Sequence, residues 1–198
     1  MIEFTNLNQE VPYLSFKKKY DDALNANQKN IEAISISSYS KKLKEVNARF
    51  VNLKFVNDRQ FIFFSNYNSP KSKEFEDHKQ ITGLIFWSST NVQVRIKAYI
   101  EKTSIEFNKA YFSKRDKKKN ALAFSSDQSR FISSYKDVQD NFEKSLKNEN
   151  LSECPDYWGG YSFTPYYFEF WHGQESRLNK REVYKLQKNG WVLSFIQP

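Results

Sequence analysis

The eleven residues 92–102, VQVRIKAYIEK, alternate along most of their length between apolar and polar side chains. Val92, Val94 and Ile96 share one side, whereas Gln93 and Arg95 share the other. Successive side chains of a strand point to opposite faces, so this period of two predicts a strand with one buried and one polar face. Gln93 is the one uncharged amide on the polar face.

Further extended segments surround this strand. Alternating runs predict strands at residues 31–37 and 49–55, and short apolar runs predict strands buried on both faces at 60–65 and 83–87. The motif KNGW at 188–191 predicts a two-residue hairpin between two C-terminal strands. Helices are predicted over 14–24, from Ser69–Pro70 onward, from Ser104 to Phe112, and over 134–148. Short strands with inserted helices predict a mainly β fold of the α+β class, built as a small antiparallel barrel.

The chain has 198 residues and neither a low-complexity linker nor an internal repeat. We therefore expect one domain over 1–198, with the N-terminal helical segment 1–29 packed on the barrel. No apolar run approaches the length of a membrane span, and the N-terminus lacks the pattern of a secretory signal. The single cysteine, Cys154, fits a reducing compartment, so we expect a cytoplasmic protein.

The formal net charge of +8 is compatible with nucleic acid, an anionic membrane surface or a phosphorylated small molecule as a partner. A basic β-barrel that binds nucleic acid is permitted by this charge, but no recognisable nucleic-acid motif supports it. We expect neither nucleic acid nor a membrane as the partner. The basic cluster 114–119 follows an aromatic pair, Tyr111 and Phe112, which leaves it open as a binding element.

Several chemistries can be excluded. The five glycines do not have the spacing of a dinucleotide fingerprint or of a phosphate-binding loop. His78 and His172 have no Cys or His partner at metal-ligand spacing, so no metal site is expected. A phosphate group must therefore be held by arginine, lysine and hydroxyl side chains.

Candidate phosphate ligands begin with Arg49 and Lys54, which the 49–55 strand places on opposite faces. Near the ends of the strand, both can still serve one elongated anionic ligand, although a pair of surface cations is the plainer interpretation. Polar or aromatic candidates recur at Ser65, Lys71, Gln93, Gln128, Ser129, Trp171, Arg177 and Arg181.

Motifs in this order resemble the pyridoxine/pyridoxamine 5′-phosphate oxidase family, a group of FMN-dependent split-barrel enzymes. The motifs are RFVNLK, FIFFSNYNSPKS, VQVRIKAYIEK, YFSKR, DQSRFIS, YWGGY and FEFWHGQESRLNKR, and the resemblance runs from about Asn30 to the C-terminus. It implies an oxidase that converts pyridoxamine or pyridoxine 5′-phosphate to pyridoxal 5′-phosphate with O2, releasing H2O2. It also implies hydride transfer from the 4′-carbon of the substrate to flavin N5, and a homodimer with FMN at its interface.

The resemblance also implies the site residues. The FMN positions are Arg49, Phe50, Val51, Asn52, Leu53, Lys54, Phe64, Ser65, Lys71, Gln93, Gln128, Ser129, Trp171 and Arg181. The substrate positions are Lys54, Tyr111, Arg115, Lys119, Arg177 and Asn179, of which Arg177 and Asn179 belong to the reacting side and are the expected catalytic residues.

Three positions depart from the family pattern. Pro70 stands where the family has an arginine, Lys119 where it has a serine, and Asn179 where it has a histidine. Most FMN positions are kept, while several substrate positions differ. Two hypotheses therefore remain open: the oxidase itself, or a divergent split-barrel flavoprotein that binds FMN but acts on another substrate or has lost the oxidase activity.

Overall fold

The computed structural model describes residues 1–198. Ten strands form one sheet: β1 (Glu3–Thr5), β2 (Ala33–Ser40), β3 (Glu45–Asn52), β4 (Phe55–Asn57), β5 (Gln60–Asn66), β6 (Gln80–Trp87), β7 (Val92–Lys102), β8 (Trp158–His172), β9 (Lys180–Gln187) and β10 (Gly190–Phe195). The helices are α1 (Val11–Asn25), α2 (Pro70–Asp77), α3 (Ile105–Lys114), α4 (Lys117–Ser125) and α5 (Tyr135–Asn148).

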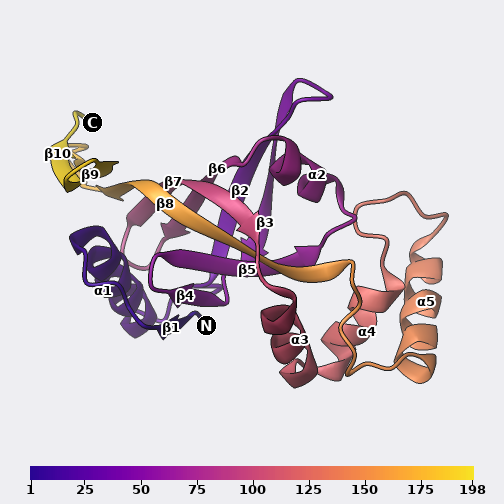
Figure 1. The fold of residues 1–198 in the computed structure, drawn as a ribbon. Helices are drawn as coiled ribbons and strands as arrows, with labels where there is room; N and C mark the ends of the chain where they lie inside the picture. Colours follow the sequence, from indigo (N-terminus) through magenta and orange to yellow (C-terminus); the bar gives the residue numbers. More distant parts are fainter.

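The sheet follows the order β1-β4-β5-β8-β7-β6-β2-β3, and β9 pairs with β8 and β10 with β9. All neighbours are antiparallel except β1 and β4, which are parallel. No strand pairing joins β1 to β3, so the barrel is split between these edges. The long strands β7 and β8 run through its centre, and the β9–β10 hairpin extends from one end (Figure 1). The prediction of a mainly β split barrel with inserted helices is confirmed.

The alternation of residues 92–102 is realised in β7. Val94, Ile96 and Ala98 are fully buried in the core, while Gln93 and Arg95 lie half-exposed on the outer face. The core also takes large aromatic side chains from β5 and β8. Since burying apolar surface is the main favourable term in folding, this alternation fixes which face of β7 points inward.

Helix α1 covers one end of the barrel (Figure 1). It buries Tyr13, Phe16 and Tyr20, and the ring centroid of Phe16 lies 5.0 Å from that of Phe61 in β5. The helix predicted over 14–24 is thus present with slightly wider bounds. No helix of the chain combines the length and apolar character needed to cross a bilayer.

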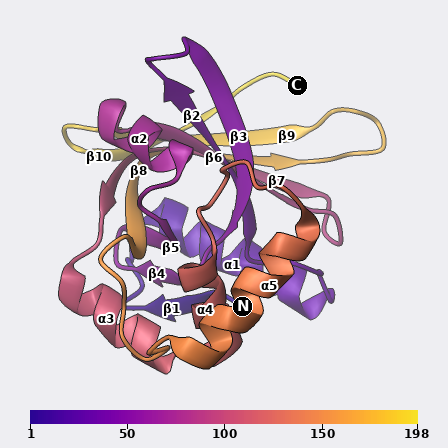
Figure 2. The ribbon, with the colours of Figure 1, turned by 90° about the vertical axis from the view of Figure 1, so that its right-hand side faces the viewer.

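The other end of the barrel carries α3, α4 and α5, which lie together in both views (Figures 1 and 2). Ser104 begins α3 by accepting a hydrogen bond from the Phe107 amide at 3.2 Å, and Ser134 begins α5 in the same way. Both helices were predicted. Helix α4 was not predicted, although Asp116 caps it through the Lys119 amide at 3.2 Å.

Two strand predictions need correction. The 49–55 segment is not one strand, because β3 ends at Asn52 and β4 begins at Phe55, with Leu53 fully buried between them. The 83–87 segment is not buried on both faces, since Leu84 is 37% and Phe86 54% exposed. Both side chains lie on the outer face of β6, which alternates like its neighbour β7.

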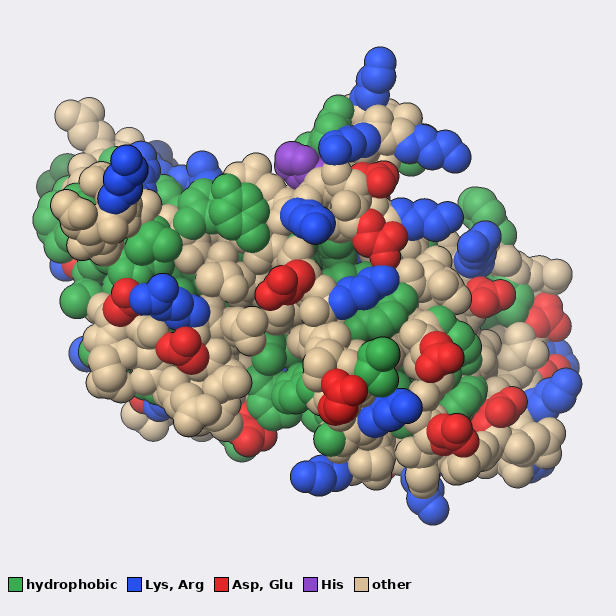
Figure 3. Space-filling model, viewed as in Figure 1, with side chains coloured by type: hydrophobic (Ala, Val, Ile, Leu, Met, Phe, Trp, Pro, Cys, Tyr) green, Lys and Arg blue, Asp and Glu red, His purple; other side chains and the backbone are tan.

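The C-terminal hairpin has the predicted two-residue connection, because Gln187 pairs directly with Gly190. Gly190 has φ +110°, a conformation that favours glycine. A second hairpin, β2–β3, projects from the body of the barrel, and lysine side chains stand out at its tip (Figure 3). Lys41, Lys42 and Lys44 are the exposed lysines of this tip.

Candidate functional site

A cleft of about 340 Å³ opens where β3 and β5 end, beside the start of α2 and the segment 126–130. Four of its side chains are cationic and none is acidic. The lining residues are Arg49, Phe50, Val51, Asn52, Lys54, Phe64, Ser65, Lys71, Tyr111, Arg115, Gln128 and Ser129. A concave surface with charges of one sign attracts the opposite sign, so this cleft is suited to an anionic ligand.

One oxygen in this cleft accepts hydrogen bonds from three donors. Gln128 Oε1 lies 2.9 Å from Lys71 Nζ, 3.1 Å from Ser65 Oγ and 3.3 Å from the backbone nitrogen of Asn66. A cation, a hydroxyl and a backbone N–H that converge on one point form the donor set that holds an oxyanion. Ser129, the next residue, has φ 65° and turns the chain away from this point.

Arg49 is fixed by contacts behind the cleft. Its Nη1 donates to Ser38 Oγ at 2.6 Å and to the Ile36 carbonyl at 3.3 Å, and its Nη2 donates to Glu74 Oε2 at 3.0 Å. A guanidinium has five N–H donors, so Arg49 keeps donors for a ligand in the cleft.

Lys71 is buried, and burial lowers the pKa of its ammonium to about 8. The neighbouring Arg49 contributes to this lowering of the pKa, whereas Glu74 opposes it. A buried amine with a depressed pKa is stabilised in its charged form by a bound anion. Lys71 is therefore the cation of the cleft whose charge depends on pH near neutrality.

Lys54 and Arg115 form a second group of cations in another part of the cleft, and Lys119 adds a third positive charge beside it. Burial lowers the pKa of Lys54, Glu32 opposes this, and the nearby charges of Lys119 and Arg115 lower it further. Lys119 itself lines an adjoining hollow of about 190 Å³, together with Arg115. Cations this close repel one another, and a second anionic group would relieve that repulsion.

Arg115 is oriented by the start of α4. Its Nη1 donates to the Lys119 carbonyl at 2.6 Å and to Asn120 Oδ1 at 3.0 Å. Its guanidinium carbon lies 5.0 Å from the centre of the Trp158 ring, within the range of a cation–π contact. The unpredicted helix α4 thus holds a predicted substrate residue in place.

Aromatic rings stack along the wall of the cleft. The ring of Phe64 lies 3.9 Å from Tyr111 with an interplanar angle of 9°, and 5.1 Å from Trp158 with an angle of 8°. Phe64 therefore sits in a column of parallel rings. Burial raises the pKa of the Tyr111 hydroxyl, which stays protonated and can donate to an anion.

Three expected flavin residues form a separate group. Gln93 pairs with Trp171, and Trp171 pairs with Arg181, so their side chains form one row on the outer face of β7, β8 and β9. None of them lines the cleft. Strands β6 and β2 lie between β7 and β3 in the sheet. The axes of β7 and β3 are therefore three strand spacings apart, or about 14 Å along the sheet.

Glu169 holds Arg181 in this row. Arg181 donates to Glu169 Oε1 from Nε at 2.9 Å and from Nη2 at 2.6 Å, and Arg95 pairs with the other oxygen. Burial raises the pKa of this carboxyl, but the hydrogen bonds from Arg181, Tyr167 and Arg95 outweigh burial and the pKa is lowered. The carboxylate is therefore charged, and Arg181 has a fixed orientation.

The remaining expected residues lie elsewhere. Arg177 and Asn179 belong to the turn between β8 and β9, where Arg177 is exposed with φ 60° and Asn179 Oδ1 accepts from the Gln174 amide at 3.0 Å. Leu53 is fully buried in the core and does not line the cleft. Neither residue of the turn lies in the cleft of its own chain.

Two residues of the site were missed by the sequence reasoning. The backbone N–H of Asn66 is one of the three converging donors, and Trp158 stacks on Phe64. The pairing of Asn66 with Trp158 places them side by side at the end of β5. The sequence signal beside Trp158 is Gly159. A side chain at this position would clash, because its Cβ would lie 2.2 Å from the Tyr67 hydroxyl.

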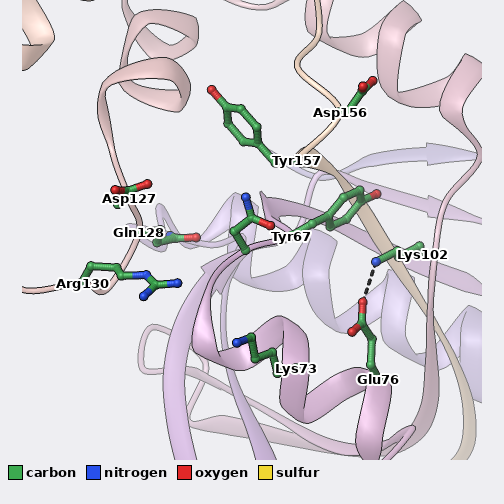
Figure 4. Close-up of a pocket in the computed structure, with 10 residues that line it drawn as sticks. Tyr67, Lys73, Glu76, Lys102, Asp127, Gln128, Arg130, Asp156 and Tyr157 are labelled. Carbon is green, nitrogen blue, oxygen red and sulfur yellow. Dashed lines mark hydrogen bonds and ion pairs between the residues drawn. The ribbon is translucent and has the colours of Figure 1, made fainter.

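A larger hollow of about 680 Å³ lies on the other side of Gln128 (Figure 4). Its wall carries both signs of charge, and Lys102 is paired there with Glu76 at 2.6 Å. Asp127 and Asp156 face it as well. The smaller cleft beside Arg49 and Lys71, which has no acidic side chain, is therefore better suited to an anion than this hollow.

Comparison with known proteins bears on this arrangement. A model described as the pyridoxine 5′-phosphate oxidase C-terminal dimerisation region matches residues 158–198. A pyridoxine/pyridoxamine 5′-phosphate oxidase of Vesicomyosocius okutanii subsp. Calyptogena okutanii is 35% identical over 189 residues, covering 94% of this chain and 88% of the relative. The protein of the same name from Aliarcobacter butzleri is 31% identical over 201 residues, covering 100% of this chain and 93% of the relative.

Solved structures share the fold. PhzG from Burkholderia lata 383, in complex with tetrahydrophenazine-1-carboxylic acid, has a TM-score of 0.88 at 22% identity and covers 94% of this chain and 92% of its own. A pyridoxamine 5′-phosphate oxidase-related, FMN binding protein from Nostoc punctiforme has a TM-score of 0.77 at 11% identity, covering 92% and 97%.

Fold and cleft together define a split β-barrel with a cationic cleft, and PhzG and the FMN binding protein from Nostoc punctiforme share this fold. Relatives above 30% identity cover nearly the whole chain. The chain belongs to the pyridoxine/pyridoxamine 5′-phosphate oxidase family, which is a family of FMN-dependent oxidoreductases, and it is an enzyme of that kind. The family resemblance of the sequence motifs is confirmed.

Proposed function

We propose that this protein binds FMN and oxidises pyridoxamine 5′-phosphate or pyridoxine 5′-phosphate to pyridoxal 5′-phosphate, with O2 as the electron acceptor and H2O2 as a product. The observation that carries the proposal is the convergence of Lys71 Nζ, Ser65 Oγ and the Asn66 amide on one oxygen of an acid-free cleft. A phosphate oxygen can take the place of Gln128 Oε1 and accept the same three hydrogen bonds. The names of the relatives support the same reaction.

The flavin phosphate is held by Arg49, Lys71 and Ser65, with Gln128 and Ser129 beside it. Bound FMN supplies the redox chemistry, by accepting a hydride from the substrate and returning the electrons to O2. The side chains of Phe50, Val51 and Asn52 line the path from the phosphate ligands toward Lys54. No histidine lines this cleft, which agrees with a reaction that needs little acid–base machinery from the protein.

The second cation group holds the substrate phosphate. Lys54, Arg115 and Lys119 supply the positive charge, and Tyr111 supplies a hydroxyl donor. Lysine at 119 is a competent phosphate ligand, although it is less directional than arginine. Two cation groups, in the cleft and in its adjoining hollow, match a cofactor and a substrate that each carry a phosphate.

The protein acts as a homodimer of single-domain chains, residues 1–198 with the segment 1–29 packed on the barrel. Phe50, Leu84 and Phe86 expose apolar surface on the outer face that also carries Gln93 and Trp171. Exposed apolar patches of this kind mark interfaces. The match of residues 158–198 to a dimerisation region supports the same conclusion.

In that dimer, the cleft of one subunit faces the outer row of the other. Gln93 then hydrogen-bonds the polar edge of the flavin ring, Trp171 offers an aromatic surface beside it, and Arg181 completes the set. Arg177 and Asn179 reach the reacting side of the substrate from the same turn. This arrangement accounts for expected flavin residues that β2 and β6 hold apart within one chain.

Turnover of pyridoxamine 5′-phosphate by the FMN-saturated protein, measured as peroxide release, tests the reaction. The alternative is a flavoprotein with another substrate, and the replaced positions Pro70, Lys119 and Asn179 favour it. Full FMN binding without peroxide release would select that alternative. Protein that neither carries nor takes up FMN would exclude both.

Asn179→His is expected to raise kcat/KM for pyridoxamine 5′-phosphate by about tenfold, or about 1.4 kcal/mol. Asn179 is held by the Gln174 amide, a hydrogen bond that an imidazole nitrogen can also accept, so the turn should keep its shape. A histidine near the substrate adds a group that titrates near neutral pH, which asparagine lacks. Steady-state kinetics of both forms measure the change, and Asn150→His, at an exposed position just after α5, is the matched control. No turnover by either form, with FMN fully bound, would contradict the oxidase.

FMN affinity is expected to fall as the pH rises above about 8. In the free protein the Lys71 pKa is about 8, and the bound phosphate raises it. Below that pKa the lysine is already charged and the affinity is complete; above it the free protein must take up a proton to bind, so the affinity falls by up to about tenfold per pH unit. Flavin titrations between about pH 7 and 9.5 measure this, in a range where the phosphate stays doubly ionised.

The control for this pH dependence is Lys71→Arg, because a guanidinium does not titrate in this range. The fall should disappear in that variant. An unchanged dissociation constant for the parent protein across the range would show that Lys71 does not contact the phosphate.

A further inference from the structure

Glu74 is a buried carboxylate that the proposed reaction does not use. Its side chain is 8% exposed, and it does not line the cleft. Its Oε2 accepts from Arg49 Nη2 at 3.0 Å and from the Ser38 hydroxyl, and its Oε1 accepts from Asn47 Nδ2 at 3.0 Å. Buried carboxylates are rare, and the one charged partner of this carboxylate is Arg49, a residue of the phosphate subsite.

Helix α2 places this carboxylate and Lys71 on one face, because residues three apart in a helix are neighbours. Lys71 Nζ reaches forward to the point where the three donors converge, while the Glu74 carboxylate lies behind Arg49. Ser38 closes the arrangement, since its hydroxyl contacts both Arg49 and Glu74. Arg49 is thereby held by Ser38, Glu74 and the Ile36 carbonyl, and its Nε–H and one Nη2–H make no hydrogen bond within the chain.

The two cations would otherwise repel each other. Arg49 lowers the pKa of Lys71 and Glu74 raises it, so the carboxylate is the countercharge that keeps both cations in place. This matters more in a chain with Pro70, because the subsite depends on these two cations alone. A residue that orients Arg49 therefore contributes more to phosphate binding when few other cations share the subsite.

We propose that Glu74 is the positioning residue of the phosphate subsite, which orients Arg49 and lets it share the subsite with Lys71. The inference rests on the proposed FMN binding. The direct electrostatic effect of the Glu74 charge would weaken FMN binding, since a carboxylate near a phosphate repels it. Removing the charge would strengthen FMN binding if Glu74 were a bystander, and it weakens binding if Glu74 positions Arg49.

Glu74→Gln is therefore compared with Glu76→Gln, which removes the same charge from the same helix. Glu76 pairs with Lys102 and has no contact with Arg49. Flavin fluorescence quenching gives dissociation constants for FMN and for riboflavin, which lacks the phosphate. We expect Glu74→Gln to weaken FMN binding by at least about fivefold and to leave riboflavin unchanged, while Glu76→Gln changes FMN binding by less than about twofold.

A double-mutant cycle shows whether Glu74 acts through Arg49. In an Arg49→Ala background, Glu74→Gln should cause no further loss of FMN affinity. Unchanged or tighter FMN binding by folded Glu74→Gln would overturn the proposal. An equal loss in the Arg49→Ala background would overturn it as well.

Thermal melts establish that the variants are folded. If Glu74→Gln does not fold, Ser38→Ala removes the bridging hydroxyl alone; a selective loss of FMN over riboflavin supports the proposal, and equal binding overturns it. The parent protein is titrated first. A parent that does not bind FMN refutes the proposed function and this inference with it, whereas a parent that binds FMN beside an unaffected Glu74→Gln refutes only the inference.

Discussion

Arg49→Ala is expected to weaken FMN binding by at least tenfold, since charge-assisted hydrogen bonds to a phosphate are the stronger class and this variant removes one of two cations in the subsite. The loss should concern the phosphate, so riboflavin binding should change little. Titration of the purified protein with FMN, followed by flavin quenching, measures the effect. The variant also leaves the buried Glu74 carboxylate without its cation, so a lower melting temperature should accompany the weaker binding.

Arg59→Ala is the matched control for this change. Arg59 also pairs with a carboxylate, that of Glu10 at 2.7 Å, but it is half-exposed and lies outside the cleft. Its removal should alter FMN affinity by less than about twofold, in keeping with the small contribution of exposed ion pairs. Equal FMN affinity of Arg49→Ala and the parent would remove Arg49 from the phosphate subsite. A parent protein that is colourless and shows no quenching would end the flavin assignment.

Preorganised donors would let the proposed phosphate subsite hold a phosphate with Pro70 where the family resemblance implies an arginine. Pro70 occupies the first turn of α2, where its fixed φ suits a helix start. The hydroxyls of Ser69 and Ser72 donate to the Asn66 carbonyl at 2.7 and 2.8 Å, which fixes the turn before the helix. The backbone N–H of Asn66 thereby points to the same oxygen, Gln128 Oε1, that Lys71 Nζ contacts. A rigid turn thus supplies a backbone donor beside the remaining cations.

The strands and most helices were predictable because their signals are local. The alternation of 92–102, the serine caps of α3 and α5 and the turn before Gly190 each involve a few adjacent residues. Helix α4 was missed because its lysines resemble a solvated charge run, and its cap, Asp116, lies inside that run. The break at Leu53 was missed because alternation continues through it, and only the packing of the core shows that the chain turns there.

The candidate site residues followed from the family resemblance, whereas their arrangement in space did not. The family resemblance named the residues, while the division between the cleft and the outer row depends on how β2 and β6 separate β3 from β7. Strand order over such distances is set by tertiary packing and is not written in any local motif. Glu74 and the Asn66 amide carry no local signal either, because their roles depend on Arg49 and Gln128, which are distant in the sequence.

Mixing two variants that each bind FMN weakly is expected to restore parent-like FMN affinity at part of the sites. If each site takes Arg49 from one subunit and Arg181 from the partner, homodimers of Arg49→Ala or of Arg181→Ala have two defective sites. A mixed dimer has one intact site and one site with both defects, because the twofold axis exchanges the subunits. Arg181→Ala should still fold, since Arg95 keeps the buried Glu169 paired. Equal amounts, refolded together, give about half mixed dimers, so about one quarter of all sites should bind FMN with the parent affinity.

The control mixture combines Arg49→Ala with Lys71→Ala, whose residues lie in the same cleft. A mixed dimer of this pair carries one defect in each site, so no site with the parent affinity should form. FMN titration of both mixtures, with light scattering to establish that they are dimeric, gives the comparison. Recovery in the control mixture, or none with Arg181→Ala, would mean that the outer row does not complete the partner's cleft. Recovery confined to the Arg49 and Arg181 pair would join the two groups of residues, which β2 and β6 hold apart within one chain, into a single site across the dimer.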